Sequence, residues 1–280
     1  MDRLQGLTAG LLAVLMLGAM TTVRAGELPL WEAGIGLAGL DTPDYRGSEQ
    51  RQQWLLPLPL FIYRGERLRI DREGLRGIFH EDSRLQLTLS LNGSVPAASD
   101  GDSARAGMAD LDPTLEIGPS LNLTLHRDAD WRLRLRLPVR GVLATDLRQV
   151  RGIGSVFWPN LAIDTPQRYG AWEYGASIGP LFGSNAWHDY FYRVNPADAT
   201  PERPACDPGG GYSGTTLMLS LTRRSPRWWF GAFLRYDRLA GVAFADSPLV
   251  ERDDSLQAGF GLSWMFARSS RSVGRTEVWR

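Results

Sequence analysis

Two short stretches of the sequence carry residues that could act as a nucleophile or base. The segment "GASIG" at 175–179 matches the G-x-S-x-G pattern that surrounds the nucleophilic serine of many hydrolases, here Ser177. That nucleophile needs a sharp turn from a strand into a helix, whereas Gly175, Ser177 and Gly179 are spaced as the small residues of one strand face. We therefore interpret the match as a coincidence.

The second stretch is "WHDYFY", which sets His188 beside Asp189. Such a pair could serve as a general base in a hydrolase, but on a loop it is more often part of a polar surface. The segment continues through Tyr190 and Tyr192 into a run rich in proline and glycine, which indicates an ordered loop. This loop could be a lid or a docking surface, or it could only cover a rim.

Other kinds of site have little support. Cys206 is the single cysteine, which excludes internal disulfides and multi-cysteine metal sites. Nothing resembles a metal site, a phosphate-binding loop or a dinucleotide fingerprint, so we expect no cofactor. The net charge is zero and all 31 basic residues are arginine, so no cationic surface for nucleic acid is indicated.

The elements that would position these residues are strands of period two. In "WRLRLRLPVR" leucine and arginine alternate, so that the apolar side chains of a strand share one face and the charged ones the other. A helix would scatter the arginines around its circumference. The charged face carries Arg132, Arg134, Arg136 and Arg140.

The same alternation recurs along the chain, and the connections differ in length. We expect about twelve strands, near 31–40, 52–63, 67–71, 74–79, 84–92, 113–125, 130–144, 152–164, 170–180, 212–223, 227–238 and 255–266. If 67–79 is one bent strand, the count and its parity change, and ten strands is the alternative. Short turns alternate with long loops at 93–112, 181–211 and 239–254, as in outer-membrane barrels with short periplasmic turns and longer extracellular loops. Pro57, Pro59 and Pro138 each delete a backbone donor, and we expect bulges or strand ends there.

We expect the apolar face of each strand to meet lipid. A twelve-stranded barrel is too wide for side chains to fill, and its polar face suits a wet lumen. Aromatic residues near strand ends are typical of membrane-interface girdles: Trp31, Trp54, Tyr63, Trp131, Trp172, Tyr174, Trp228, Tyr236 and Trp264. Besides the four arginines, the predicted lumen-facing residues are Glu116, Glu173, Arg235 and Asp237, with Asp164 as a further partner for arginine. The predicted extracellular-loop residues are His188, Tyr190 and Tyr192.

The ends of the chain predict export and a tail. Arg3, an apolar run over 7–20 and "VRA" before Gly26 indicate a signal peptide over 1–25, cleaved after Ala25. The run is shorter than a membrane-spanning helix needs. We therefore expect an antiparallel up-and-down β-barrel in the Gram-negative outer membrane over 26–266, followed by a periplasmic tail over 267–280.

An ordered set of short segments resembles the MipA/OmpV family of outer-membrane proteins. These are "PDYRGS" at 43–48, "PLPLFIYRGERL" at 57–68, "DLDPTLEIGP" at 110–119, "YFYRVNP" at 190–196, "GGGY" at 209–212 and "DSPLV" at 246–250. Two features depart from the family: Cys206 stands where an aromatic residue is more typical, and the tail extends beyond the terminal aromatic, Phe266.

The resemblance implies a non-enzymatic scaffold, because the family's namesake is an adaptor between a murein-cleaving lytic transglycosylase and a penicillin-binding peptidoglycan synthase. The expected partners are therefore outer-membrane lipid, a murein hydrolase and a peptidoglycan synthase. The alternatives are a porin-like channel, a barrel for surface ligand binding or adhesion, and an outer-rim hydrolase that uses His188 and Asp189. Related barrels host different functions, so the fold does not choose among them.

Overall fold

The computed structural model describes residues 27–71, 74–99, 104–146, 148–166 and 170–274. The predicted signal peptide and the last six residues of the tail lie outside the described residues. No helix in the described ranges is long and apolar enough to span a bilayer.

The described chain is almost entirely strand, with one helix. In chain order the elements are β1 (Glu27–Pro29), β2 (Trp31–Pro43), β3 (Arg51–Arg64), β4 (Leu68–Asp71), β5 (Gly74–Glu81), β6 (Leu85–Ser94), β7 (Thr114–Arg127), β8 (Arg132–Thr145), β9 (Val150–Phe157), β10 (Asn160–Asp164), β11 (Trp172–Gly183), α2 (Asn185–Tyr192), β12 (Gly211–Arg224), β13 (Trp228–Arg238), β14 (Asp254–Arg268) and β15 (Ser272–Gly274).

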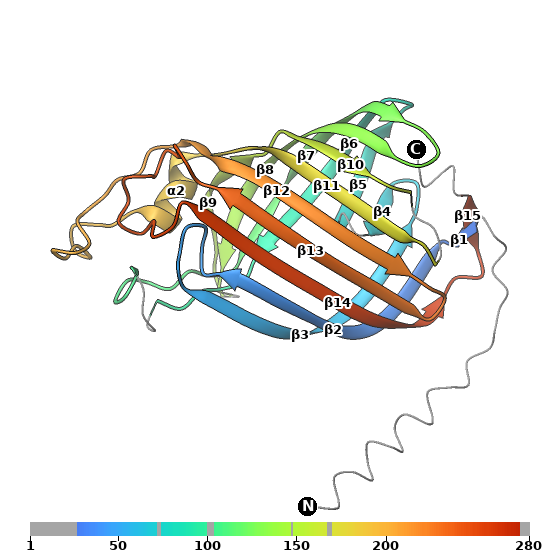
Figure 1. The fold of residues 1–280 in the computed structure, drawn as a ribbon, viewed down its shortest axis with the longest axis horizontal. Coiled ribbons are helices and arrows are strands. Elements are labelled where there is room, and N and C mark those ends of the chain that lie inside the picture. Colours follow the sequence, from blue (N-terminus) through green and yellow to red (C-terminus); the bar gives the residue numbers. More distant parts are fainter. Residues whose placement is uncertain (1–26, 72–73, 100–103, 147, 167–169, 275–280) are drawn as a thin grey trace, which may run out of the picture.

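The sheet closes on itself into an antiparallel barrel (Figure 1). Consecutive strands pair from β2 to β8 and from β11 to β14, and β14 pairs back onto β2. Both β9 and β10 lie between β8 and β11. They are two pieces of one wall position, so the barrel has the predicted twelve positions, and the prediction of an all-β barrel is confirmed.

The predicted strand 152–164 is broken at Trp158 and Pro159, and this break lies opposite Pro138 of β8. The expectation of a bulge or strand end at Pro57 and Pro59 is wrong, because β2 and β3 pair without a register shift. Those two prolines are tolerated for another reason, described below.

The two faces of the wall differ in the way that a membrane barrel requires. Apolar side chains such as Leu121, Ile178 and Phe260 are exposed on the outside, while polar ones such as Thr88, Asn122 and Ser263 are buried inside. A closed sheet also leaves few backbone groups unpaired, which a hydrocarbon environment demands. The apolar face is therefore the lipid-facing one.

The two ends of the barrel are unlike. The loops over 95–113, 184–210 and 239–253 lie with α2 at one end, which we call the long-loop end, and the β1–β15 pair lies at the other, the short-turn end (Figure 1). In outer-membrane barrels the short turns face the periplasm and the long loops face outward. The prediction missed α2, β1 and β15.

Candidate functional site: the lumen and its roof

The arginines of β8 pair with a carboxylate on the neighbouring wall strand. The register sets Asp164 of β10 opposite Arg132. Arg132 Nη2 lies 3.0 Å from Asp164 Oδ2, and Arg134 Nη2 lies 2.5 Å from Asp164 Oδ1. All three side chains are buried, so one carboxylate joins two guanidinium groups inside the barrel.

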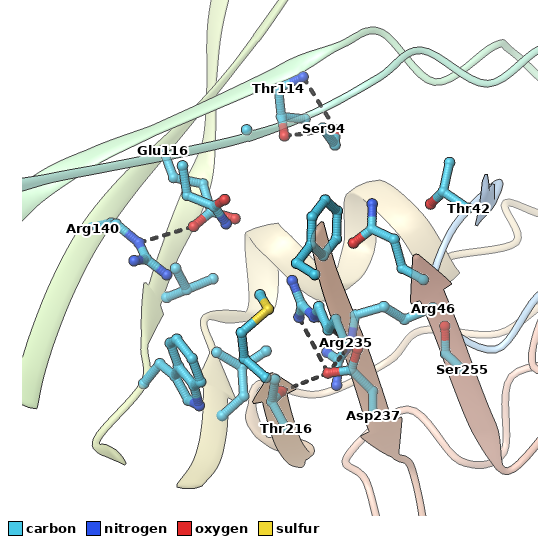
Figure 2. Close-up of a pocket in the computed structure, with 18 of the residues that line it drawn as sticks. Thr42, Arg46, Ser94, Thr114, Glu116, Arg140, Thr216, Arg235, Asp237 and Ser255 are labelled. Atoms are coloured by element: carbon cyan, nitrogen blue, oxygen red, sulfur yellow. Dashed lines mark hydrogen bonds and ion pairs between the residues drawn. The ribbon is translucent and has the colours of Figure 1, made fainter. Parts of the chain in front are cut away.

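Arg140 pairs with another predicted residue, Glu116 of β7. Arg140 Nε lies 2.9 Å from Glu116 Oε2 (Figure 2). Arg140 Nη1 also donates to Ser90 Oγ at 3.2 Å. These contacts join β8 to β7 and β6 across the interior.

A third cluster forms around Asp237 of β13. Its carboxylate lies 2.8 Å from Arg235 Nε and 3.2 Å from Arg46 Nε, and it accepts a hydrogen bond from Thr216 Oγ1 at 2.5 Å (Figure 2). Arg46 comes from the β2–β3 loop and was not among the predicted site residues. Its position could not be inferred from alternation, which is informative only within strands.

The remaining predicted lumen residues are Arg136 and Glu173. Arg136 lines the interior cavity described below. Glu173 is buried on β11, opposite Thr222 of β12.

A buried charge cluster near the short-turn end was missed. Glu32 of β2 contacts both Arg64 of β3 and Arg224 of β12, with Arg64 Nη1 2.9 Å from Glu32 Oε2. Arg69 and Glu81 pair on β4 and β5, with Nη2 2.9 Å from Oε2. The signal was available, because Glu32 lies on the same strand face as Gly34 and Gly36, opposite the apolar face of Ile35 and Leu37.

A cavity of about 640 Å³ lies inside the barrel, between the Glu32 and Arg69–Glu81 clusters and the long-loop end. Its lining mixes charged residues, hydroxyls and apolar side chains from several strands, including Thr42, Leu91, Ser94, Glu116, Arg136, Arg140, Met218, Phe233, Arg235 and Asp237. Figure 2 shows the Arg140–Glu116 pair and the Asp237 cluster within it. The cavity can therefore hold a ligand with both polar and apolar parts.

Helix α2 contributes to the roof of this cavity through Trp187, Phe191 and Tyr192. Ser184 caps the helix, since its side chain accepts from the Trp187 N–H. Tyr192 stacks on Phe244 with ring centroids 3.7 Å apart and donates to the Arg46 carbonyl at 2.9 Å. Tyr190 accepts from the Asp112 N–H at 2.8 Å. The roof is thus a packed cluster drawn from several loops.

His188 is fully buried in this roof. Its Nδ1 lies 2.6 Å from the Gly209 carbonyl and its Nε2 lies 2.5 Å from Ser213 Oγ. Burial lowers the pKa of His188 below its usual 6.5, and the charge of Arg46 lowers it further. The adjacent Asp189 instead pairs with Arg193 at 3.1 Å. The two side chains do not form the dyad that an outer-rim hydrolase would need.

The model of the family described as MltA-interacting protein MipA matches residues 35–266. The chain belongs to the MipA family. The family resemblance seen in the short segments is thereby confirmed, and the match covers the whole closed wall from within β2 to within β14.

Several solved structures of outer-membrane proteins are similar to this MipA-family chain at low identity. A bacterial polysaccharide outer membrane secretin has a TM-score of 0.42 at 10% identity, covering 84% of this chain and 99% of its own. The outer membrane protease OmpT from Escherichia coli has a TM-score of 0.30 at 10% identity, covering 88% and 99%. OprG from Pseudomonas aeruginosa has a TM-score of 0.24 at 8% identity, covering 87% and 96%. No curated protein sequence matches significantly.

The MipA-family barrel is accordingly an outer-membrane protein. Its lipid-facing leucines, closed wall and asymmetric ends agree with that location.

Proposed function

We propose that this protein is a non-enzymatic scaffold of the outer membrane that holds peptidoglycan-remodelling enzymes, a lytic transglycosylase and a penicillin-binding synthase. The family's description names an interaction with MltA, and a barrel fixed in the membrane can hold periplasmic partners through its short-turn end.

The observation that carries the proposal over a channel is the charge cluster near the short-turn end. The side chains of Glu32, Arg64 and Arg224 are each at most 5% exposed. Ions and water would need a continuous path past these groups, and buried ion pairs resist opening because separating them leaves charges uncompensated. Buried ion pairs across the lumen near this end support a structural role for the barrel.

The short-turn end offers a rigid surface for a partner. Its turns are ordered by side-chain acceptors: Asp82 accepts from the Arg84 and Leu85 N–H groups, and Asp128 from those of Asp130 and Trp131. At this end β1 pairs with β15, where Leu28 lies opposite Val273. We propose this surface as the docking site and the remaining tail as an extension of it.

Crosslinking and capture from native membranes test the proposal. Wild-type protein should recover a murein hydrolase or a peptidoglycan synthase, and Val273→Pro, which breaks the β1–β15 pair, should reduce recovery several-fold. Ala199→Pro, on an exposed loop at the opposite end, is the matched control and should leave recovery unchanged. Repeated capture of neither enzyme by the wild type would overturn the scaffold role.

Recordings in planar bilayers separate the scaffold from the porin-like alternative. We expect no steady conductance from the reconstituted wild type. A stable open channel would refute the view that the Glu32, Arg64 and Arg224 cluster blocks the path of ions. We also propose that export removes residues 1–25, so that N-terminal sequencing of the membrane form should begin at Gly26.

A further inference from the structure

The barrel wall is incomplete between β3 and β6. Strand β3 pairs with β4 only at Tyr63 and Arg64, and the β4–β5 hairpin turns back after Asp71. Strand β6 pairs with β5 through Gln86, Leu87 and Thr88, and Gly77 of β5 also lies beside Leu89, since a Cβ on Gly77 would be 3.6 Å from the Leu89 Cβ. Among the described residues, 51–59 of β3 have no paired neighbour on the side away from β2, because the β4–β5 hairpin reaches only the end of β3 near Tyr63. We call this part of the wall the notch.

The notch lies toward the long-loop end, because β4 and β5 occupy only the part of the wall near the short-turn end (Figure 1). Two strand positions are missing at this level. At an interstrand spacing of about 4.8 Å, the opening between β3 and β6 is at most about 14 Å wide.

The sequence of β3 is adapted to a free edge. The Arg64 N–H donates to the Leu30 carbonyl at the β2 side. N–H groups alternate between the two edges of a strand, and the β2–β3 register is unbroken, so Pro57 and Pro59 occupy positions whose N–H would point into the notch. Proline is tolerated at a free edge, where it removes a donor that has no partner. It also interrupts pairing with any strand that would fill the notch.

The inner face of β3 is apolar along most of its length. The face that carries the buried Ile62 and Arg64 also carries Trp54, Leu56, Leu58 and Leu60. Leu56 is 38% exposed although it points inward. The buried indole Nε1 of Trp54 has no hydrogen-bond partner among the described residues. The inward face of β6, by contrast, carries Gln86, Thr88, Ser90 and Asn92.

The notch lies near the lumen cavity, which is lined by the neighbour of β3 and by the end of β6. The cavity lining includes 90–95 on and after β6, and Leu40 of β2, which pairs with Trp54. Unpaired backbone is tolerated at membrane depth only where it lines a wet cavity or is covered by protein. A notch that communicates with the cavity would provide such an environment for the free edge of β3.

We propose that the notch is a lateral opening that admits a membrane amphiphile, with its acyl chain along the inner face of β3 and its polar head in the cavity. The apolar side chains of β3 suit an acyl chain and would be poorly placed against water alone. The hydroxyls and charged groups of the cavity, including Ser94, Thr114 and Arg136, suit a polar head. An added strand is disfavoured by the two prolines.

Quenching of tryptophan fluorescence by phosphatidylcholine brominated in its acyl chains tests the proposal, because bromine quenches only on close approach. Trp54 points inward, so a complete wall would shield it. We expect that Trp54→Phe removes a quenched component of the fluorescence. Trp228→Phe should do the same, because Trp228 is 51% exposed on the lipid face. Trp158→Phe is the matched control, since Trp158 also lines the cavity and its indole Nε1 donates to the Gly179 carbonyl of β11 at 3.2 Å. It should remove only unquenched fluorescence.

A second variant shows that the inner face of β3 binds the chain. Leu56→Gln with Leu58→Gln gives β3 the polar inner face of its neighbours and should at least halve the quenching of Trp54. The proposal would be overturned if bromine quenched Trp54 no more than it quenches Trp158. In that case water, a closed wall or a second copy of the barrel would occupy the notch. Quenching of Trp54 that the double variant leaves intact would overturn the assignment of the chain to this face.

Discussion

The buried cluster around Glu32 gives the sharpest test of how the lumen is stabilised. Glu32→Gln keeps the size and shape of the side chain but removes its charge. Two buried guanidinium groups, those of Arg64 and Arg224, would then face a neutral amide.

The magnitude follows from the geometry. At 2.9 Å and an effective dielectric constant of about 20, the Glu32–Arg64 attraction alone is about 6 kcal/mol before desolvation is subtracted. Net costs of removing one partner from a buried pair are about 3–5 kcal/mol. We expect Glu32→Gln to lower the free energy of unfolding by that amount.

Urea unfolding in phospholipid vesicles, followed by tryptophan fluorescence, measures the effect. Glu66→Gln, at an exposed turn, is the matched control and should change stability by less than about 0.5 kcal/mol. Adding Arg224→Met to Glu32→Gln removes one of the two facing cations and should recover part of the loss. A loss below about 1 kcal/mol for Glu32→Gln would refute the view that this ion cluster is strongly coupled.

Three further outcomes are expected. Leu121→Arg, on the lipid face of β7, should destabilise the barrel by about 2–4 kcal/mol in vesicles. Met218→Arg, in the cavity, should be tolerated. Equal costs for the two variants would contradict the assignment of the lipid-facing and lumen-facing sides. Gly154→Ala should loosen the roof at a cost of about 1–3 kcal/mol, because Gly154 has a φ of +121° and a Cβ there would collide with Ser184 Oγ. Gly152→Ala should leave the roof unchanged, because no atom lies within 4 Å of the added Cβ. Protease cleavage within 193–210 of the folded barrel should therefore increase in Gly154→Ala and not in Gly152→Ala. The roof should also loosen as the pH falls below about 6.5, because the folded pKa of His188 is lowered and the unfolded chain binds the proton more readily. Cleavage of the same loop measured from pH 8 to pH 5 should rise toward acid in the wild type and lose that pH dependence in His188→Gln.

Most of the fold could be predicted from the alternation of polar and apolar residues within strands. Because side chains of period two report the two faces of a sheet directly, the wall positions and the lipid-facing side were predictable from segments such as that of β8. The break between β9 and β10 was not, since it depends on how Trp158 and Pro159 pack opposite Pro138. The helix α2 had a readable signal: Ser184 as cap, followed by Trp187, His188 and Phe191 at helical spacing.

The charged pairs were predictable as a kind of contact but not as particular pairs. Asp164, Glu116 and Asp237 were recognised as possible partners for arginine, yet which arginine each carboxylate meets depends on the stagger of neighbouring strands. The pairing of one carboxylate with both Arg132 and Arg134 follows from the β8–β10 register, which a single sequence does not encode locally. Arg46 reached its site from a loop, where no periodicity guides inference.

The pairing of β1 with β15 has a consequence for biogenesis. These strands join the start of the described chain to its final described residues, so this clasp can form only after the whole polypeptide has been delivered to the membrane. The seam between β2 and β14 joins nearly the same distant segments, and loop closure over such a span is slow. A chain without residues 272–274 would reach the membrane able to build every hairpin and the β2–β14 seam, yet without the clasp that adds to this seam.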